Sequence, residues 1–360
     1  MNAHVCRAVA AAVVTAAVGL TACGEAGEPG ASREGAFTIG LLLPGAGGRE
    51  HPDRSLTEAK IKELCANCPM QYANARDDAA TQRQQIDSMI TKGVDVLILD
   101  AVDPKAVRSS VEAAHQTGIP VVAYDRLAEG PISGYVTFDG ARVGRIQAEA
   151  LLRAMGAKAH GGQIVMMNGA TTDPNAGWFK HGALSALKGK VKIARSYDTV
   201  EWRAQNAYNN MVGAIAALGA DNIDGVYAAN DNLASGAIAA LRAAKIKPLP
   251  PVTGQDADLR AVQRIVKGDQ YMTAYKPFRL EAGTAAQMAV ALGRGEELGA
   301  IAKDRVSSPT TKDIPAALLT PVSVTADNIK GTVVKDGVHT IDQICTPEFR
   351  AACKKVGLTP

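Results

Sequence analysis

The sequence predicts an α/β protein of two lobes, each a parallel sheet flanked by helices. Short apolar runs alternate with helix-period patterns along the chain, an order that favours right-handed crossovers and parallel strands. Several of these runs stop on a polar residue that precedes a helix, as at Asn230 and Asp256. Ligands of open α/β sheets bind beyond the carboxyl ends of the strands, so these residues predict a site at a sheet rim. The pattern restarts near residue 140, and 360 residues exceed one ordinary core, so we expect two lobes.

The first lobe is predicted to begin at Phe37, with strands and helices in alternation. The expected strands cover residues 37–43, 70–73, 94–99, 119–124 and 134–138. The expected helices cover residues 56–64 and 81–92, with a third that starts at Pro104 and ends at Gly118. Asp103 suits the N-cap of that third helix, because its side chain can accept from free amides, and Pro suits the first helical position.

The second lobe is predicted to repeat the pattern. Its expected helices cover residues 143–155, 178–187, 203–218, 233–243 and 259–266. Its expected strands cover residues 163–167 and 191–196, with two more that stop at Asn230 and Asp256. Residues 271–275 return as a strand, 280–292 form a helix of the first lobe, and 318–322 cross again. We therefore expect three hinge crossings between an N-terminal lobe (37–139 and 277–317) and a C-terminal lobe (140–276 and 318–360).

Residues 1–22 are predicted to be a lipoprotein signal peptide. Arg7 supplies a positive start, and the apolar run 8–19 is too short to span a bilayer comfortably. The run ends in Leu20-Thr-Ala-Cys23, which resembles a bacterial lipobox, so we expect a lipid on Cys23 and an extracytoplasmic protein anchored to the cell membrane. Residues 23–36 would then form a flexible tether. The alternative is an ordinary secretory signal with a coincidental cysteine.

The four cysteines beyond the signal are expected to form local disulfides, Cys65 with Cys68 and Cys345 with Cys353. An exported protein meets an oxidising compartment, which favours disulfides. Four cysteines allow three connectivities, so the pairing stays open. A zinc site would have to gather thiolates from opposite ends of the chain. A redox Cys-x-x-Cys normally opens a helix, whereas this one follows a predicted helix.

The sequence lacks the common motifs of enzymes and nucleic-acid-binding proteins. It contains no Walker loop, His-Glu-x-x-His, Gly-x-Ser-x-Gly or Gly-x-Gly-x-x-Gly motif, and its six histidines are scattered. A net charge of +3 with both signs interspersed argues against a nucleic-acid surface. We therefore expect no catalysis, cofactor, metal or nucleic acid, although paired carboxylates such as Asp125 and Asp256 leave general acid-base chemistry as an alternative.

The polar residues at the predicted strand ends suit a small hydroxylated ligand. Carboxylate, amide, guanidinium and ammonium groups bind hydroxyls, and an aromatic ring covers the apolar face of a sugar. The candidates from strand ends are Asp125, Arg126, Asn230, Asp256 and Lys276, with Trp202 as the stacking ring. Each has a structural alternative: a helix cap for Asp125 and Asn230, a hinge surface charge for Lys276, and lobe packing for Trp202.

From Phe37 to about Gly337 the chain resembles the periplasmic sugar-binding proteins of ABC importers with the type I fold, in particular those that bind D-xylose. The matching motifs are Ala123-Tyr-Asp-Arg126, Phe138-Asp139, Asp173-Pro-Asn175-Ala176, Trp202, Ala229-Asn230-Asp231, Gly254-Gln-Asp-Ala-Asp-Leu259, Tyr275-Lys-Pro277 and Leu318-Leu-Thr-Pro321. The resemblance implies that Asp125 and Arg126 bind ligand from the first lobe, and that Asn175, Asn230 and Asp256 bind it from the second. Lys276 would reach in from a crossing strand, and Trp202 would stack.

The same resemblance implies the biological role. A monomeric, lipid-anchored binding protein would capture a monosaccharide, such as xylose or a similar aldopentose, by lobe closure and deliver it to an ABC permease. The alternatives are a sugar receptor that feeds a membrane signalling kinase and a binder of a more polar ligand.

One stretch departs from the family pattern. Members usually have an Arg-aromatic-Glu cluster in the loop after the first strand, whereas this chain has Gly48-Arg-Glu-His-Pro-Asp-Arg54. The aromatic ring is missing, and Arg49 and Asp53 are the candidate ligand-binding residues that remain. Arg49 or His51 in place of the ring would suit a more polar or anionic ligand, or a sugar held from one face.

Overall fold

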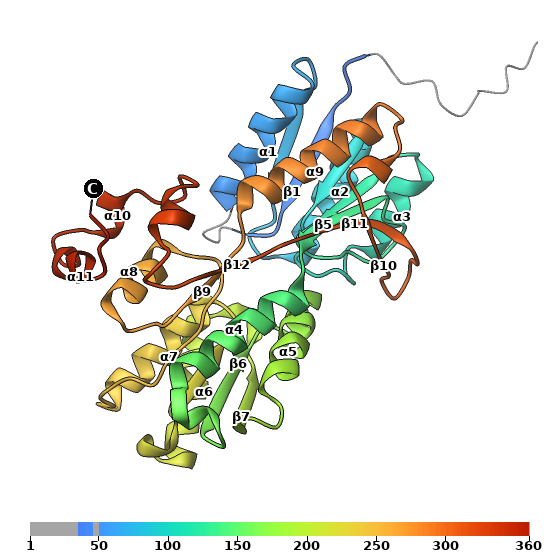
Figure 1. Cartoon of the computed structure of the whole chain (residues 1–360). Helices are drawn as coiled ribbons and strands as arrows, with labels where there is room; N and C mark the ends of the chain where they lie inside the picture. The colour runs from blue at the N-terminus through green and yellow to red at the C-terminus, as the bar shows by residue number, and fades with distance from the viewer. Residues whose placement is uncertain (1–34, 46–49, 360) are drawn as a thin grey trace, which may run out of the picture. The chain divides into compact units, whose positions relative to one another are not determined.

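The computed structural model describes residues 35–45 and 50–359 and contains two parallel sheets flanked by helices (Figure 1). This confirms the predicted fold class. The signal peptide, Cys23 and Arg49 lie outside the described residues. Within the described ranges no helix is both long and apolar enough to cross a bilayer.

The larger sheet forms the first lobe and has the strand order β10-β11-β5-β4-β3-β1-β2. Its strands are parallel except for β10, which pairs antiparallel with β11. Its strands are β1 Ile39–Leu43, β2 Met70–Asn74, β3 Val96–Leu99, β4 Val121–Tyr124, β5 Gly134–Phe138, β10 Asp304–Val306 and β11 Ile314–Leu319. Its helices are α1 Glu50–Leu64, α2 Ala79–Thr91, α3 Arg108–Gln116 and α9 Phe278–Gly293.

Helices cover both faces of this sheet, because its central strands are apolar on both sides. Alternate residues of β1 pack in different cores: Leu41 lies in the cluster beneath α1 and α9, and Leu42 in the cluster beneath α2 and α3. Figure 1 shows α1 and α9 side by side on one face. Although α9 lies late in the sequence, it belongs to this lobe.

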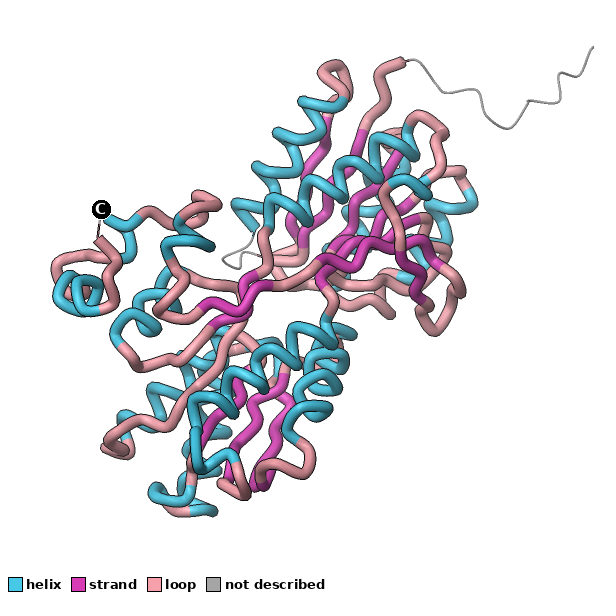
Figure 2. Tube along the Cα trace, in the orientation of Figure 1, coloured by secondary structure: helices cyan, strands magenta, loops and turns pink. Residues whose placement is uncertain are grey.

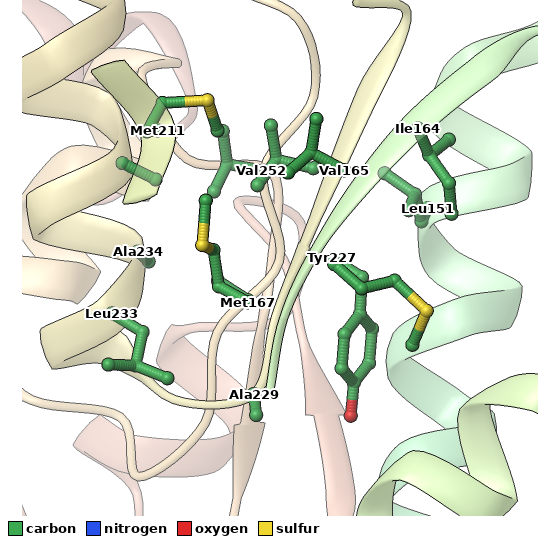
Figure 3. Packing of buried hydrophobic residues seen from close by; sticks show 14 of the residues in the cluster. Leu151, Ile164, Val165, Met167, Met211, Tyr227, Ala229, Leu233, Ala234 and Val252 are labelled. Atoms are coloured by element: carbon green, nitrogen blue, oxygen red, sulfur yellow. The ribbon is translucent and has the colours of Figure 1, made fainter. Parts of the chain in front are cut away.

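The second lobe is built on a three-stranded parallel sheet of order β7-β6-β8. Its elements are α4 Gly140–Met155, β6 Gln163–Asn168, α5 Pro174–Leu187, β7 Lys192–Asp198, α6 Ala204–Leu218, β8 Gly225–Ala228, α7 Asp231–Ala243 and α8 Leu259–Lys267. Short 3-10 turns lie at Gly156–Ala159, Val200–Trp202, Ala220–Asn222 and Leu298–Ala300, the last in the first lobe. Figure 3 shows the core, in which Met167 and Val252 face α6 and α7 while Tyr227 faces α4.

A two-stranded antiparallel ribbon, β9 Thr273–Tyr275 with β12 Val322–Val324, lies between the two sheets (Figure 2). β9 leads through Lys276 and Pro277 into α9. β11 leads through Thr320 and Pro321 into β12, and β5 leads through Asp139 into α4. The chain therefore passes between the lobes at three places.

After β12 the chain packs on α8 with short helices α10 Ile341–Ile344 and α11 Arg350–Lys355, after a π-helical turn at Lys330–Val334. The disulfide Cys345–Cys353 closes this C-terminal segment, and Cys65–Cys68 follows α1. Both pairs are those expected from the sequence.

Several local predictions were wrong. α1 begins at Glu50 and α4 at Gly140, six and three residues before the expected starts. α3 begins at Arg108, and the Asp103 side chain accepts from the amides of Lys105 and Ala106 in a preceding turn instead of capping the helix. α5 begins at Pro174, four residues before the expected start, because Asp173 caps it by accepting from Asn175 N and proline suits its first turn. The run before Asp256 forms only single bridges, from Val252 to Val226 and from Gln255 to Ala274.

Helices α4 and α5 touch through their backbones. A Cβ atom built on Gly144 would overlap the carbonyl oxygen of Phe179, and one on Gly182 would overlap that of Ala141. Only glycine permits this approach, so the two helices are locked together at two points.

We expect Gly144→Ala to lower the free energy of unfolding by about 1–3 kcal/mol, because the methyl group must push the helices apart. Gly213→Ala in α6 is the matched control, since nothing lies within 4 Å of its added Cβ. That variant should be neutral or up to about 1 kcal/mol more stable. Urea unfolding of both measures the difference, and equal stabilities would contradict the backbone contact.

Candidate ligand-binding cleft

A cavity of about 270 Å³ lies between the two lobes, at the carboxyl ends of their parallel strands. Both lobes and the β9 crossing contribute to it. It is lined by Leu43, Pro44, Gly45, Asp53, Asp77, Asp100, Asp125, Arg126, Asp173, Asn175, Phe179, Glu201, Trp202, Asn230, Asn232, Gln255, Asp256, Asp258 and Lys276.

The cavity brings together all the ligand residues proposed from the sequence that the structure describes. These are Asp53, Asp125, Arg126, Asn175, Trp202, Asn230, Asp256 and Lys276. Asn230 also caps α7, since its Oδ1 accepts from Leu233 N at 2.9 Å, so the cap and the cavity wall are compatible roles. Their part in binding stays a prediction.

Lys276 lies at the centre of the site and is only 3% exposed. Its Nζ is 3.1 Å from Asp256 Oδ1 and 4.0 Å from Asp125 Oδ1, so carboxylates of both lobes face one ammonium group. The Phe179 ring centroid is 5.9 Å away. A buried charge is costly unless it is paired, and the two carboxylates offset that cost.

Among the described residues, Arg126 and Asn175 make polar contacts between the lobes. Arg126 Nε is 3.3 Å from Asp173 Oδ2 at the start of α5, and its Nη1 donates to the carbonyls of Ala101 and Val102. Asn175 Nδ2 donates to the carbonyl of Asp125 at 3.1 Å. Burial raises the pKa of Asp173, and the positive charge of Arg126 opposes that rise. These contacts join the two lobes directly beside the cavity.

Backbone strain concentrates at the same place. Asp125, Trp202 and Asp256 have φ angles of 55°, 54° and 97°, in the region that side chains rarely adopt. Such conformations persist where the surroundings hold them, typically at functional sites. All three residues line the cavity.

Among the described residues that line the cavity, some polar atoms are buried without a hydrogen-bond partner and outside any ion pair. They include the acceptors Asn175 Oδ1 and Gln255 Oε1 and the donor Trp202 Nε1. An unpaired buried polar atom costs about 1–3 kcal/mol, so a ligand that supplies the missing partners would recover that energy. Hydroxyl groups can both donate and accept, and so suit this set.

Sequence reasoning missed several lining residues. Gln255 directly precedes Asp256, and Phe179 follows Asn175 by one helical turn, so adjacency and helix period were the available signals. Phe179 meets Trp202 edge-on, with ring centroids 6.3 Å apart. Asp173 lies in the motif Asp173-Pro-Asn175-Ala176, but no binding role was predicted for it.

A larger groove of about 800 Å³ lies beside the cavity and shares Asn232, Asp256 and Asp258 with it. Several of its polar groups are paired within the protein. Tyr275 donates to Asp336, and Arg264 donates to Gln270 and to the carbonyl of Asp231. The smaller cavity, where unpaired polar atoms gather, is therefore the stronger candidate.

Comparison with known proteins adds independent evidence. Residues 43–297 match the family model described as periplasmic binding protein domain. The chain is 39% identical over 297 residues to the D-xylose-binding periplasmic protein of Escherichia coli, covering 81% of this chain and 87% of that protein. It is 37% identical over 302 residues to the Haemophilus influenzae protein of the same description, covering 82% and 88%.

A solved structure is also similar. It is an ABC transporter solute binding protein from Clostridium phytofermentans with bound β-D-glucose, and it is 29% identical with a TM-score of 0.78. The match covers 85% of this chain and 99% of that one.

The ion pair between Arg126 and Asp173, which joins the lobes, leads to a prediction for the ligand-free protein. Arg126→Gln should favour the open arrangement by about fivefold, because the ion pair with Asp173, worth on the order of 1 kcal/mol, is lost. Small-angle X-ray scattering should then give a larger radius of gyration than the wild type. Arg142→Gln, an exposed change on α4, is the control and should leave the radius unchanged. An unaltered curve for Arg126→Gln would contradict the bridging role.

Proposed function

Because the chain belongs to the periplasmic binding protein family, we propose that it captures a monosaccharide, preferentially an aldopentose such as xylose, and delivers it to an ABC permease. As a member of a family of binding proteins, it would bind its ligand without converting it. The observation that supports a sugar most directly is the set of unpaired acceptors and donor of Asn175, Gln255 and Trp202.

The size of the cavity favours one sugar ring. At about 270 Å³ it lies just below the usual range for small-molecule pockets, about 300–1,000 Å³. Phe179 and Trp202 give it an apolar wall, and the paired charges around Lys276 give it a polar one. The relatives described as D-xylose-binding proteins support a pentose as the preferred ligand.

The charge of the cavity favours a neutral ligand. Among the lining residues that the structure describes there are eight carboxylates but only two basic groups, Arg126 and Lys276. Both basic groups face carboxylates already, Arg126 facing Asp173, and Lys276 facing Asp256. The formal charge of these described lining residues is negative, which favours a neutral ligand over an anionic one.

Lobe closure is the proposed mechanism. A ligand that contacts Asp125 and Arg126 on one side and Asn175, Asn230 and Asp256 on the other gains its full set of contacts only when the lobes are closed. It therefore shifts the equilibrium toward that state. We further propose that a lipid on Cys23 holds the protein at the outer side of the cell membrane, next to the permease.

Asp256→Ala should abolish D-xylose binding in calorimetry while leaving the far-UV circular dichroism spectrum unchanged. The substitution removes a carboxylate that would accept from sugar hydroxyls and that fixes Lys276. Asp224→Ala removes a carboxylate that pairs with Lys158 outside the cavity and should bind as the wild type does. Wild-type affinity in Asp256→Ala would refute the proposed site.

A thermal-shift comparison tests the charge argument. D-Glucose and D-glucuronate are close in size, but the second carries a carboxylate. D-Glucuronate should raise the melting temperature less than D-glucose or D-xylose, with an affinity lower by about tenfold or more, since each uncompensated repulsion costs on the order of 1 kcal/mol or above. Stronger stabilisation by D-glucuronate would show that the cavity prefers anions.

A further inference from the structure

Asp231 is a buried carboxylate that lies next to the cleft without lining it. It is 1% exposed and occupies the first position of α7, directly after Asn230. The positive end of a helix favours a negative group there. Its burial nonetheless requires partners, and the structure supplies them from two other segments, the turn that ends at Asp258 and the stretch from Gln270 to Thr273.

Three donors converge on the Asp231 carboxylate. Gln270 Nε2 donates to Oδ1 at 2.7 Å, while Thr273 Oγ1 and the amide of Asp258 each donate to Oδ2 at 3.0 Å. The backbone of Asp231 is held as well. Its amide donates to the carbonyl of Gln255, and its carbonyl accepts from Arg264. All three donors are buried or partly buried.

Each of these two segments presents a cavity residue, and so does the segment of Asp231 itself. Thr273 lies on β9, three residues before Lys276. Asp258 ends the turn that contains Asp256, and Thr273 Oγ1 also accepts from the amide of Ala257 within that turn. Asn230 is the residue before Asp231. One carboxylate therefore links the three backbone segments that present Asn230, Asp256 and Lys276.

The turn approaches Asp231 so closely that only glycine fits at position 254. A Cβ atom there would overlap Asp231 Oδ1 and Gln270 Nε2. The non-glycine residues Asp256 and Ala257 have positive φ angles of 97° and 55°, a conformation that needs external support. The bond from Asp258 N to Asp231 supplies that support at the end of the turn.

We propose that Asp231 is a positioning residue for the ligand site, holding Asp256 and Lys276 in binding geometry without touching the ligand. The proposal rests on the proposed function, because it concerns the affinity of the same cavity. It predicts that the carboxylate of Asp231 affects affinity specifically through Asp256, and not through the carboxylate of the other lobe, Asp125.

Asp231→Asn tests this at nearly constant volume, because its amide group cannot accept from both Gln270 and Thr273. We expect D-xylose affinity to fall by about tenfold or more, because one of the two buried donors is left without its acceptor. Thr273→Val removes one donor while leaving Asp231 in place and should weaken binding in the same direction. If Asp231→Asn does not fold, Thr273→Val is the variant that tests the proposal.

Double-mutant cycles separate positioning from general destabilisation. Affinities of weak variants are measured by ligand-observed NMR with D-xylose. In an Asp256→Asn background, Asp231→Asn should lower the D-xylose affinity by a much smaller factor than in the wild type, because the group that Asp231 positions is already altered. In an Asp125→Asn background, the fold-losses in affinity caused by the two substitutions should multiply. Wild-type affinity in Asp231→Asn, or losses that multiply in both backgrounds, would overturn the proposal.

A measurement without ligand distinguishes this proposal from the proposed function. Amide hydrogen exchange in the ligand-free protein should quicken at Ala257 and Asp258 in Asp231→Asn, and stay unchanged at Asn175 in the same lobe. If the wild type does not bind D-xylose but exchange changes in this pattern, the proposed ligand is wrong and the positioning role stands. If exchange at Ala257 and Asp258 is unchanged, the positioning role is wrong.

Discussion

The burial of one ammonium group shapes the whole cleft. Lys276 directly follows the crossing strand β9 and is 3% exposed, and a charge in that position needs carboxylates from its surroundings. Asp256 supplies one from the second lobe and Asp125 faces it from the first. Both carboxylates belong to residues with left-handed backbone conformations, so placing them beside Lys276 requires local backbone strain. The hinge, the rims of both sheets and the site are therefore parts of one electrostatic arrangement.

Support for that arrangement lies outside the cavity. Asp231 gathers three donors behind Asp256, and the C-terminal segment contacts the same turn from another side, where His339 Nε2 is 2.8 Å from the carbonyl of Ala257. Tyr275, the residue before Lys276, donates to Asp336 of that segment. Segments that belong to neither sheet thus contribute to the placement of ligand-binding groups.

The grouping of Asn230, Asp256 and Lys276 could be predicted from the sequence, because ligands of α/β sheets bind at the carboxyl ends of parallel strands. The family resemblance, which the comparisons confirm, added Asn175. Gln255 and Asp173 were missed because their roles arise from a strained turn and from an interlobe contact, neither of which follows a sequence period. The late start predicted for α5 had a similar origin, since a cap depends on one side-chain bond.

The glycine contact between α4 and α5 has a practical consequence. Because the two helices touch through backbone atoms at Gly144 and Gly182, they would turn as one piece in the proposed lobe closure. A fluorescent dye attached at the exposed position 181 of α5, in place of His181, would report rotation of the whole lobe, because α5 would not move independently of α4. The fold thus offers a ready scaffold for an optical biosensor whose signal originates far from the bound molecule.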